Sequence, residues 1–83
     1  MAEELIGEVS DFFCRPVVAG INVKGKLNTG DKIHIVGHTT DITMTVDSMQ
    51  INNVNVTEAN YGDAVGIKVT DRVRKGDHVF KVS

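Results

Sequence analysis

Three Gly-Asp pairs, each followed by a short apolar run, constrain the fold of this 83-residue chain more than any other feature. Glycine adopts positive φ at little cost, and an aspartate side chain can bond to nearby backbone amides, so each pair predicts a tight turn. The branched residues that follow suit the pleated surface of a strand. The pairs therefore predict an antiparallel β protein. They stand at 30–31, 62–63 and 76–77, and the second residues after the aspartates are Ile33, Val65 and Val79.

The composition agrees with strands, because valine, isoleucine and threonine contribute 27 residues while leucine and alanine contribute only six. A chain of this length has room for one small domain. We expect that domain to span 1–83, with its core over about residues 5–82. Short strands at this spacing favour an all-β fold in the form of a small antiparallel β-barrel.

Alternation of apolar and polar residues predicts about seven strands. In the first, Leu5 and Val9 share one face and Ile6 lies on the other. Asn52-Asn53 predicts a tight hairpin, because asparagine tolerates left-handed backbone. The apolar positions shift by one residue near 47–48, which predicts a β-bulge. Pro16 marks a break, Leu27 is a buried candidate within a connection, and 57–60 is a turn of helix or a loop. The expected strands cover 4–13, 17–23, 32–36, a bulged strand over 42–51 that forms the hairpin with 54–56, then 64–69 and 78–82.

The charge and the single cysteine exclude several classes of protein. A net charge of −2 argues against a dedicated nucleic-acid scavenger, although residues 60–83 carry five bases against three acids. Cys14 cannot form an internal disulfide, and no secretory signal pattern opens the chain, so a cytoplasmic location is expected. The apolar runs are far shorter than the roughly 20 residues that cross a bilayer, so no membrane association is expected.

Several segments resemble a known family, the β-barrel that forms the second domain of translational GTPases such as elongation factor Tu, elongation factor 1-alpha and initiation factor 2. The resemblance extends over almost the whole chain. Residues 48–50 and 72–82 are also similar to stand-alone translation elongation factor-like barrels, and to barrels appended to collagenase-like peptidases of the tRNA-hydroxylation type. The segments that carry the wider resemblance are 25–31, 33–37, 46–50 and 58–66.

The resemblance implies a role in holding the aminoacyl end of tRNA, but two positions depart from the family pattern. Gln50 stands where the family has a glutamate, and Ala64 stands where it has an asparagine. Gln50 keeps hydrogen-bonding capacity without the charge, whereas Ala64 removes the amide. The chain also has no Gly-x-x-x-x-Gly-Lys-Ser/Thr loop, so a GTPase would have to be a separate partner.

The sequence offers no convincing catalytic or metal site, so we expect no cofactor and no enzymatic activity. His34 and His38 are separated by a strand end, and only Asp41 lies close by in sequence. Cys14 follows two phenylalanines, which favours a packing or incidental role, and no base is placed by sequence to activate it. The aspartates of the Gly-Asp pairs are spread singly, unlike the clustered ligands of a calcium loop.

The best candidate contact surface is basic. Alternation across 72–74 puts both guanidinium groups on one side, where they can meet phosphates or carboxylates, although a solvated loop is the ordinary explanation. Tyr61 can stack on a base or cover one end of the fold. Phe12 and Phe13 face opposite ways, so one belongs to the core and the other is open to a partner. The candidate contact residues are Gln50, Tyr61, Lys68, Arg72, Arg74 and Lys75, with Lys81 nearby.

These observations support two hypotheses. The first is a non-enzymatic binding module related to translation elongation factors, which contacts RNA (tRNA or ribosome) or a translation or tRNA-modification protein through its basic C-terminal end. The alternative is a protein-interaction adaptor that docks on a separate GTPase or a peptidase-like enzyme. We expect a monomer, in which an open edge strand would allow weak dimerisation.

Overall fold

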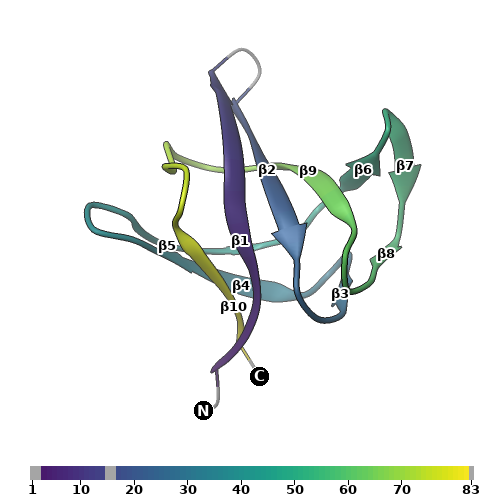
Figure 1. Cartoon of the computed structure of the whole chain (residues 1–83), viewed down its shortest axis with the longest axis horizontal. Helices are drawn as coiled ribbons and strands as arrows, with labels where there is room; N and C mark the ends of the chain where they lie inside the picture. The colour runs from purple at the N-terminus through teal and green to yellow at the C-terminus, as the bar shows by residue number, and fades with distance from the viewer. Residues whose placement is uncertain (1–2, 15–16, 83) are drawn as a thin grey trace.

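The computed structural model describes residues 3–14 and 17–82, and these fold into strands joined by turns (Figure 1). Pro16, the expected break, lies outside the described residues. The prediction of an all-β, antiparallel architecture is confirmed. The strands are β1 (Glu3–Cys14), β2 (Val17–Val23), β3 (Leu27–Asn28), β4 (Lys32–Val36), β5 (Asp41–Thr45), β6 (Met49–Ile51), β7 (Val54–Val56), β8 (Glu58–Ala59), β9 (Ala64–Lys68) and β10 (His78–Val82).

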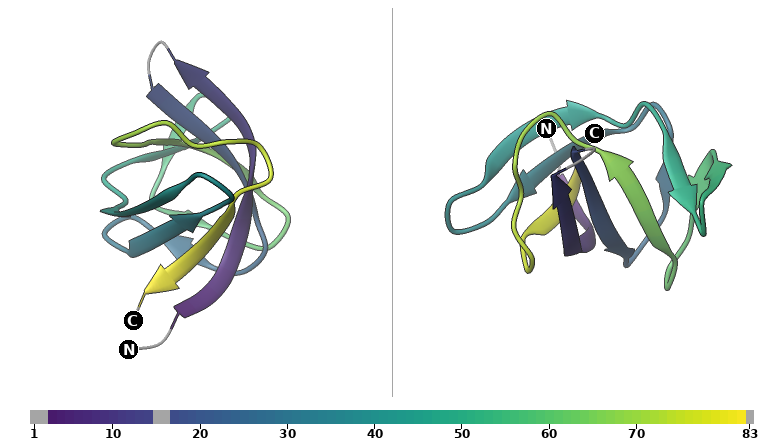
Figure 2. Two further views of the ribbon diagram at one scale, coloured as in Figure 1. Left: turned by 90° about the vertical axis from the view of Figure 1, so that its left-hand side faces the viewer. Right: turned by 90° about the horizontal axis from the view of Figure 1, so that it is seen from above.

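Eight strands form one curled antiparallel sheet in the order β5-β4-β10-β1-β2-β9-β6-β7, and β3 pairs with β8 in a second, two-stranded sheet. The first and last strands, β1 and β10, are neighbours in the middle of the large sheet. The sheet curls on itself, as the two turned views show (Figure 2), and its apolar side chains lie on the inner face. One continuous core results, whose largest fully buried side chains include Ile6, Ile21, Leu27, Ile33, Ile35, Met49 and Ile67.

The three Gly-Asp pairs end turns of the same construction, at 28–31, 60–63 and 74–77. Their glycines have φ values of 89°, 91° and 95°. In each turn the aspartate Oδ2 accepts a hydrogen bond of 2.8 Å from the backbone N–H of the first turn residue. The aspartate N–H donates in return to the carbonyl of that residue, at 3.0–3.2 Å. The turns predicted at these pairs are therefore confirmed.

Each of these turns also holds one buried valine of another segment. Val46, Val23 and Val9 each donate their backbone N–H to the turn aspartate carbonyl and accept a bond from the turn glycine N–H, at 2.8–2.9 Å. All three valines are at most 2% exposed. Each turn therefore starts a strand and also bonds to a buried residue of another segment. This fixes the start of the strand against the core, where the second residue after each aspartate is buried.

The large sheet is open, so the expectation of a barrel is wrong in its closure. Within the described residues, β5 and β7 form the two ends of the sheet and no ladder joins them. The segment between β5 and β6 crosses from one end to the other, and its Val46 bonds to the turn at 28–31. A turn therefore takes the backbone hydrogen bonds that a closing strand would need at this point.

The shift in the apolar pattern near 47–48 is not a β-bulge, because β5 ends at Thr45 and β6 begins at Met49 in opposite halves of the sheet. The phase changes because one strand stops and another starts. The sequence pattern could not distinguish this break from a bulge, since both move the apolar positions by one residue.

The irregular strand is β1, whose register shifts against β10 between Leu5 and Gly7. Its register against β2 shifts again between Val9 and Asp11. The first irregularity turns Ile6 inward, where it is 1% exposed, and leaves Leu5 44% exposed. The prediction that Leu5 shares a face with Val9, opposite Ile6, is therefore wrong.

The predictions for two short segments, 52–53 and 57–60, had different outcomes. Asn52 and Asn53 have φ values of 53° and 65°, so the predicted left-handed hairpin between β6 and β7 is confirmed. Residues 58–59, expected as a helical turn or loop, instead form β8 and pair with β3. Leu27 and Ala59 meet in that pair and are fully buried. The pairing partner is distant in the chain, so local propensity gave no sign of this strand.

Candidate functional site

A trough crosses the outer face of β2, β9 and β6. Alternation along β9 points Val65 and Ile67 into the core and leaves Gly66 on the outer face. In the ladder, Gly66 lies opposite Gly20 of β2 on one side and opposite Gln50 of β6 on the other. Two adjacent glycines therefore leave this part of the face without side chains, and larger residues stand around it.

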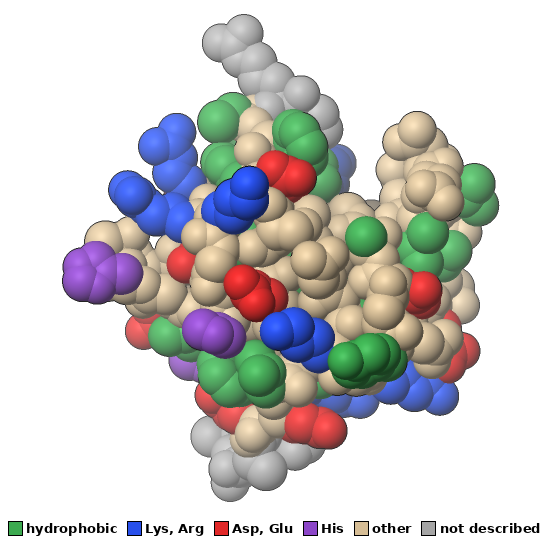
Figure 3. Space-filling view, in the orientation of Figure 1, with side chains coloured by type: hydrophobic (Ala, Val, Ile, Leu, Met, Phe, Trp, Pro, Cys, Tyr) green, Lys and Arg blue, Asp and Glu red, His purple; other side chains and the backbone are tan. Residues whose placement is uncertain are grey.

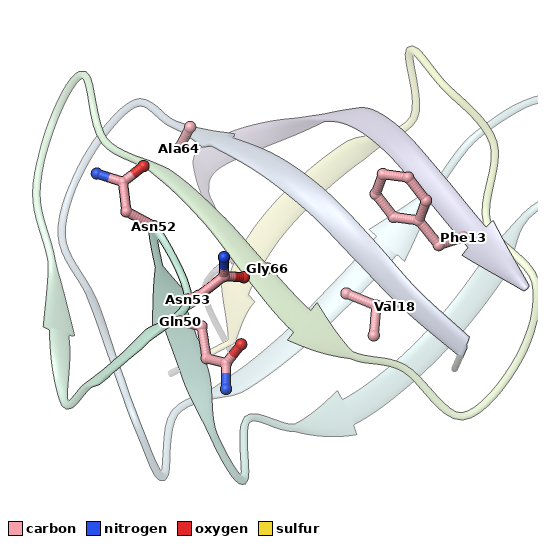
Figure 4. Close-up of a pocket in the computed structure, with 7 residues that line it drawn as sticks. All are labelled: Phe13, Val18, Gln50, Asn52, Asn53, Ala64 and Gly66. Carbon is pink, nitrogen blue, oxygen red and sulfur yellow. The ribbon is translucent and has the colours of Figure 1, made fainter. Parts of the chain in front are cut away.

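The trough consists of two adjoining hollows. The larger has a volume of about 470 Å³, and the smaller has about 260 Å³. Figure 3 shows the notch between the ends of β1 and β2 and the β6–β7 hairpin. The hollows share Val18, Gln50 and Gly66; the smaller adds Ser48 and Lys68. The larger is lined by Phe13 and Val18 at one end, by Gln50, Asn52 and Asn53 at the other, and by Ala64 and Gly66 (Figure 4).

The larger hollow combines an apolar end with a carboxamide end. Phe13 is 56% exposed, so its ring is available to a partner. The hairpin turn supplies Asn52 and Asn53, and the Gln50 Nε2 donates a hydrogen bond of 3.0 Å to the Asn55 Oδ1, which orients that carboxamide. All the lining residues are uncharged. Such a surface suits an uncharged group that offers both an apolar side chain and amide hydrogen bonds.

A separate, basic surface covers the loop between β9 and β10, where Lys and Arg side chains gather (Figure 3). Val73 is 1% exposed and anchors this loop in the core, while Arg72 and Arg74 on either side of it are exposed. The Arg72 guanidinium lies 6.0 Å from the centre of the Phe12 ring, and its Nη2 lies 3.9 Å from the Cys14 Sγ. The Arg72 side chain is therefore exposed to solvent on one side and lies against Phe12 and Cys14 on the other.

The structure does not bring the six predicted contact residues onto one surface. One residue lies in the turn that precedes β9, and three lie in the loop that follows it, so the five residues of β9 separate them. Their roles as contacts stay predictions. Gln50 and Lys68 border the trough, Tyr61 is 80% exposed in the turn at 60–63, and Arg72, Arg74 and Lys75 lie in the loop after β9.

The residues at the centre of the trough carry no strong signal in the sequence. Val18, Asn52, Asn53 and Gly66 were not among the candidate residues, although all four line the larger hollow. One signal was present, because an isolated glycine inside a strand pattern often marks close approach of another group. The paired phenylalanines did behave as expected: Phe12 packs against the core and its neighbour is exposed.

His34 lies in the other half of the sheet, between two carboxylates. Its Nδ1 is 2.8 Å from the Glu3 Oε2, and its Nε2 is 2.5 Å from the Asp41 Oδ1. The hydrogen bonds to Asp41 and to Glu3 raise the pKa of His34 above its ordinary value of 6.5. The cluster thus joins β1, β4 and β5. Within residues 3–14 and 17–82, no three His, Cys, Asp or Glu side chains are arranged to hold a metal ion.

Comparison with known proteins points to peptidases. The chain is 42% identical over 76 residues to a protein of Methanocaldococcus jannaschii described as an uncharacterized protease. That match covers 90% of this chain but 19% of the length of the relative. No protein-family model matches the chain.

The fold is that of a solved domain. The crystal structure of the C-terminal domain of a Geobacillus thermoleovorans protein described as a U32 peptidase has a TM-score of 0.90 with this chain, at 16% identity. The match covers 96% of this chain and 93% of that domain. A selenomethionine variant of the same domain gives a TM-score of 0.87, at 15% identity and with coverage of 92% and 96%. Within its described part, the chain has no helix able to cross a membrane.

These comparisons overturn the identification with translation factors and the main functional hypothesis built on it. The relative is described as a protease, and the matching structures belong to a U32 peptidase. The hypothesis of a translation-factor module that contacts RNA through its basic end is therefore wrong, and the alternative of an adaptor on a peptidase-like enzyme fits better. Gly-Asp turns and alternating strands are general devices of small antiparallel sheets, so they did not discriminate between the two families.

Proposed function

We propose that the chain is a non-catalytic docking module that binds a peptidase-like catalytic protein. The observation that carries this proposal is the match at 42% identity to 19% of the M. jannaschii protease. The greater part of that relative lies outside the match and has ample length for a catalytic body. We infer that a small module of this kind acts by binding the catalytic body, and the trough, whose larger hollow is uncharged, offers a surface for doing so.

The chemistry of the described residues supports a non-catalytic role. The exposed Cys14 has the Arg72 Nη2 at 3.9 Å as its hydrogen-bonding neighbour, and that group cannot accept the thiol proton. His34 is held by Glu3 and Asp41, so both of its ring nitrogens already face carboxylates. A nucleophile next to a general base is the minimal requirement for covalent peptide hydrolysis. We therefore assign hydrolysis to the partner and binding to this chain.

The test uses a defined partner, namely the M. jannaschii relative with its matching 76-residue segment deleted. Titration calorimetry and size-exclusion chromatography would measure its binding to this chain. We expect a one-to-one complex with a dissociation constant of about 10 μM or tighter, in the range of transient domain contacts. Circular dichroism would first confirm that the shortened relative is folded. If it is folded and shows no binding at about 100 μM of each protein, the proposal is refuted.

A further inference from the structure

Gly66 is a glycine that nothing inside the molecule requires. It is not at one of the positive-φ positions, unlike the three turn glycines. A Cβ at Gly66 would lie 3.5 Å from the Val18 Cγ1, which is an ordinary van der Waals contact. Glycine in the middle of a strand weakens it, since it adds backbone entropy to the unfolded chain and packs no side chain. The conformation and the packing of the module itself therefore leave this choice of residue unexplained.

Its neighbour Gly20 differs, because a Cβ there would lie 3.3 Å from the Asp11 Cβ and 3.4 Å from the Ser10 Oγ. A side chain at Gly20 would therefore push against β1 at the point where the register of that strand shifts. A Cβ at Gly66 would instead have only the Val18 Cγ1 within 4 Å, and Gly66 forms part of the floor of the trough. A glycine with free space on its outer side is suited to the close approach of a group from another molecule.

The lining of the trough defines what that group can be. Phe13 and Val18 offer apolar contact, and the carboxamides of Gln50, Asn52 and Asn53 offer donors and acceptors that match a peptide backbone. A phosphate or other strong anion would find no charged group in the larger hollow, because all its lining residues are neutral. Lys68, at the border of the smaller hollow, supplies a single positive charge.

We propose that the trough over Gly66 holds an extended peptide segment of the peptidase-like partner, which seats an uncharged, apolar side chain between Phe13 and Gln50. An acidic residue in the same segment, next to the apolar one, pairs with Lys68. This inference rests on the proposed docking function and specifies where docking occurs. The hollow of about 470 Å³ accommodates one large side chain together with its flanking backbone.

The matched pair Gly66→Ala and Gly25→Ala tests the assignment. Both glycines are half-buried, and a Cβ at Gly25 would also lie 3.5 Å from its nearest side-chain atom, the Ile6 Cγ2, in a loop outside the trough. Binding to the segment-deleted relative would be measured by calorimetry for both variants. We expect at least a tenfold weaker affinity for Gly66→Ala and a Gly66→Val variant, wild-type affinity for Gly25→Ala, and melting temperatures no lower than wild type for Gly66→Ala.

The outcomes separate this inference from the proposed function. If the wild-type chain binds the relative and both Gly66 variants bind equally well, the trough is not the docking site, although docking itself stands. If the wild-type chain does not bind, the proposed function fails and this inference fails with it. Light scattering of the chain alone provides a further test, because self-association that Gly66→Val abolishes would show that a second copy of the chain fills the trough, which overturns the assignment.

Discussion

Replacement of Asp77 by alanine should destabilise the fold far more than the same replacement at Asp63, although both residues occupy the same position in equivalent turns. Asp77 is 5% exposed, and its Oδ2 accepts a bond of 2.8 Å from the Arg74 N–H. The corresponding bond from the Asn60 N–H to Asp63 is also 2.8 Å long but lies at the surface. The bond at Asp77 is partly buried, so water replaces that acceptor less readily than it replaces the acceptor at Asp63.

The magnitude follows from this difference in burial. Loss of a hydrogen bond to a charged group that leaves a buried donor unpaired costs about 1.5–3 kcal/mol. A surface cap of the same geometry is worth about 0.5–1 kcal/mol. The free energy of unfolding for a domain of this length is about 4–12 kcal/mol, so Asp77→Ala removes a large fraction of it. A loss of about 2 kcal/mol lowers the melting temperature by about 8–16 °C.

Urea unfolding followed by far-ultraviolet circular dichroism would measure both variants against the wild type. A second variant checks the burial argument, because a Cβ at Gly37 would overlap the Asp77 Oδ1. Gly37→Ala should therefore be strongly destabilising in the wild type and much less so in the Asp77→Ala background. Equal losses at Asp77 and Asp63, or additive effects of Gly37→Ala and Asp77→Ala, would refute this account of the turns.

Two further predictions concern β1 and the His34 cluster. Gly7→Ala should lower the free energy of unfolding by about 1–3 kcal/mol, because overpacking a tight site is destabilising. The added Cβ would lie 2.9 Å from both the Asn22 carbonyl oxygen and the Ile21 Cγ2. Urea titration would measure this loss, and an unchanged midpoint would contradict it. The raised pKa of His34 means that the folded state holds the proton more tightly than the unfolded state. Its stabilisation should be complete below about pH 6.5 and lost as the pH rises through the raised value, so wild type minus His34→Gln melting differences should fall with pH; a flat difference would exclude the charged link.

Much of the fold could be predicted from the sequence because the residue patterns that specify it are local. A positive-φ glycine followed by a capping aspartate at 30–31, 62–63 and 76–77 specifies a turn wherever it occurs, and strict alternation specifies which side of the next strand is buried. The Asn52-Asn53 hairpin was equally legible. The errors fell where pairing is non-local: β8 exists only because β3 lies beside it, and Ile6 is buried only because β1 is irregular against β10.

The candidate site was much less predictable, because it is formed by residues from four different strands and one turn. Residue types that suggest chemistry in isolation, such as Arg72 and Tyr61, lie on different surfaces. Gly66 and Val18 suggest none, yet they line the hollow that the sheet order creates between β2 and β6. Only the neighbours of a glycine in space show whether its missing side chain serves the fold or leaves room for a partner.

The sequence alone determined that this chain is an antiparallel β protein with three glycine-aspartate turns, because backbone conformation and face alternation depend on residues close together in the chain. It did not determine to which family of proteins the chain is related, since unrelated small β proteins share such turns. Only the tertiary structure showed that the sheet stays open between β5 and β7 and that a trough lies over Gly66. It also showed that the turns form backbone hydrogen bonds with Val9, Val23 and Val46. These properties depend on contacts between distant segments, whose geometry the order of residues does not display.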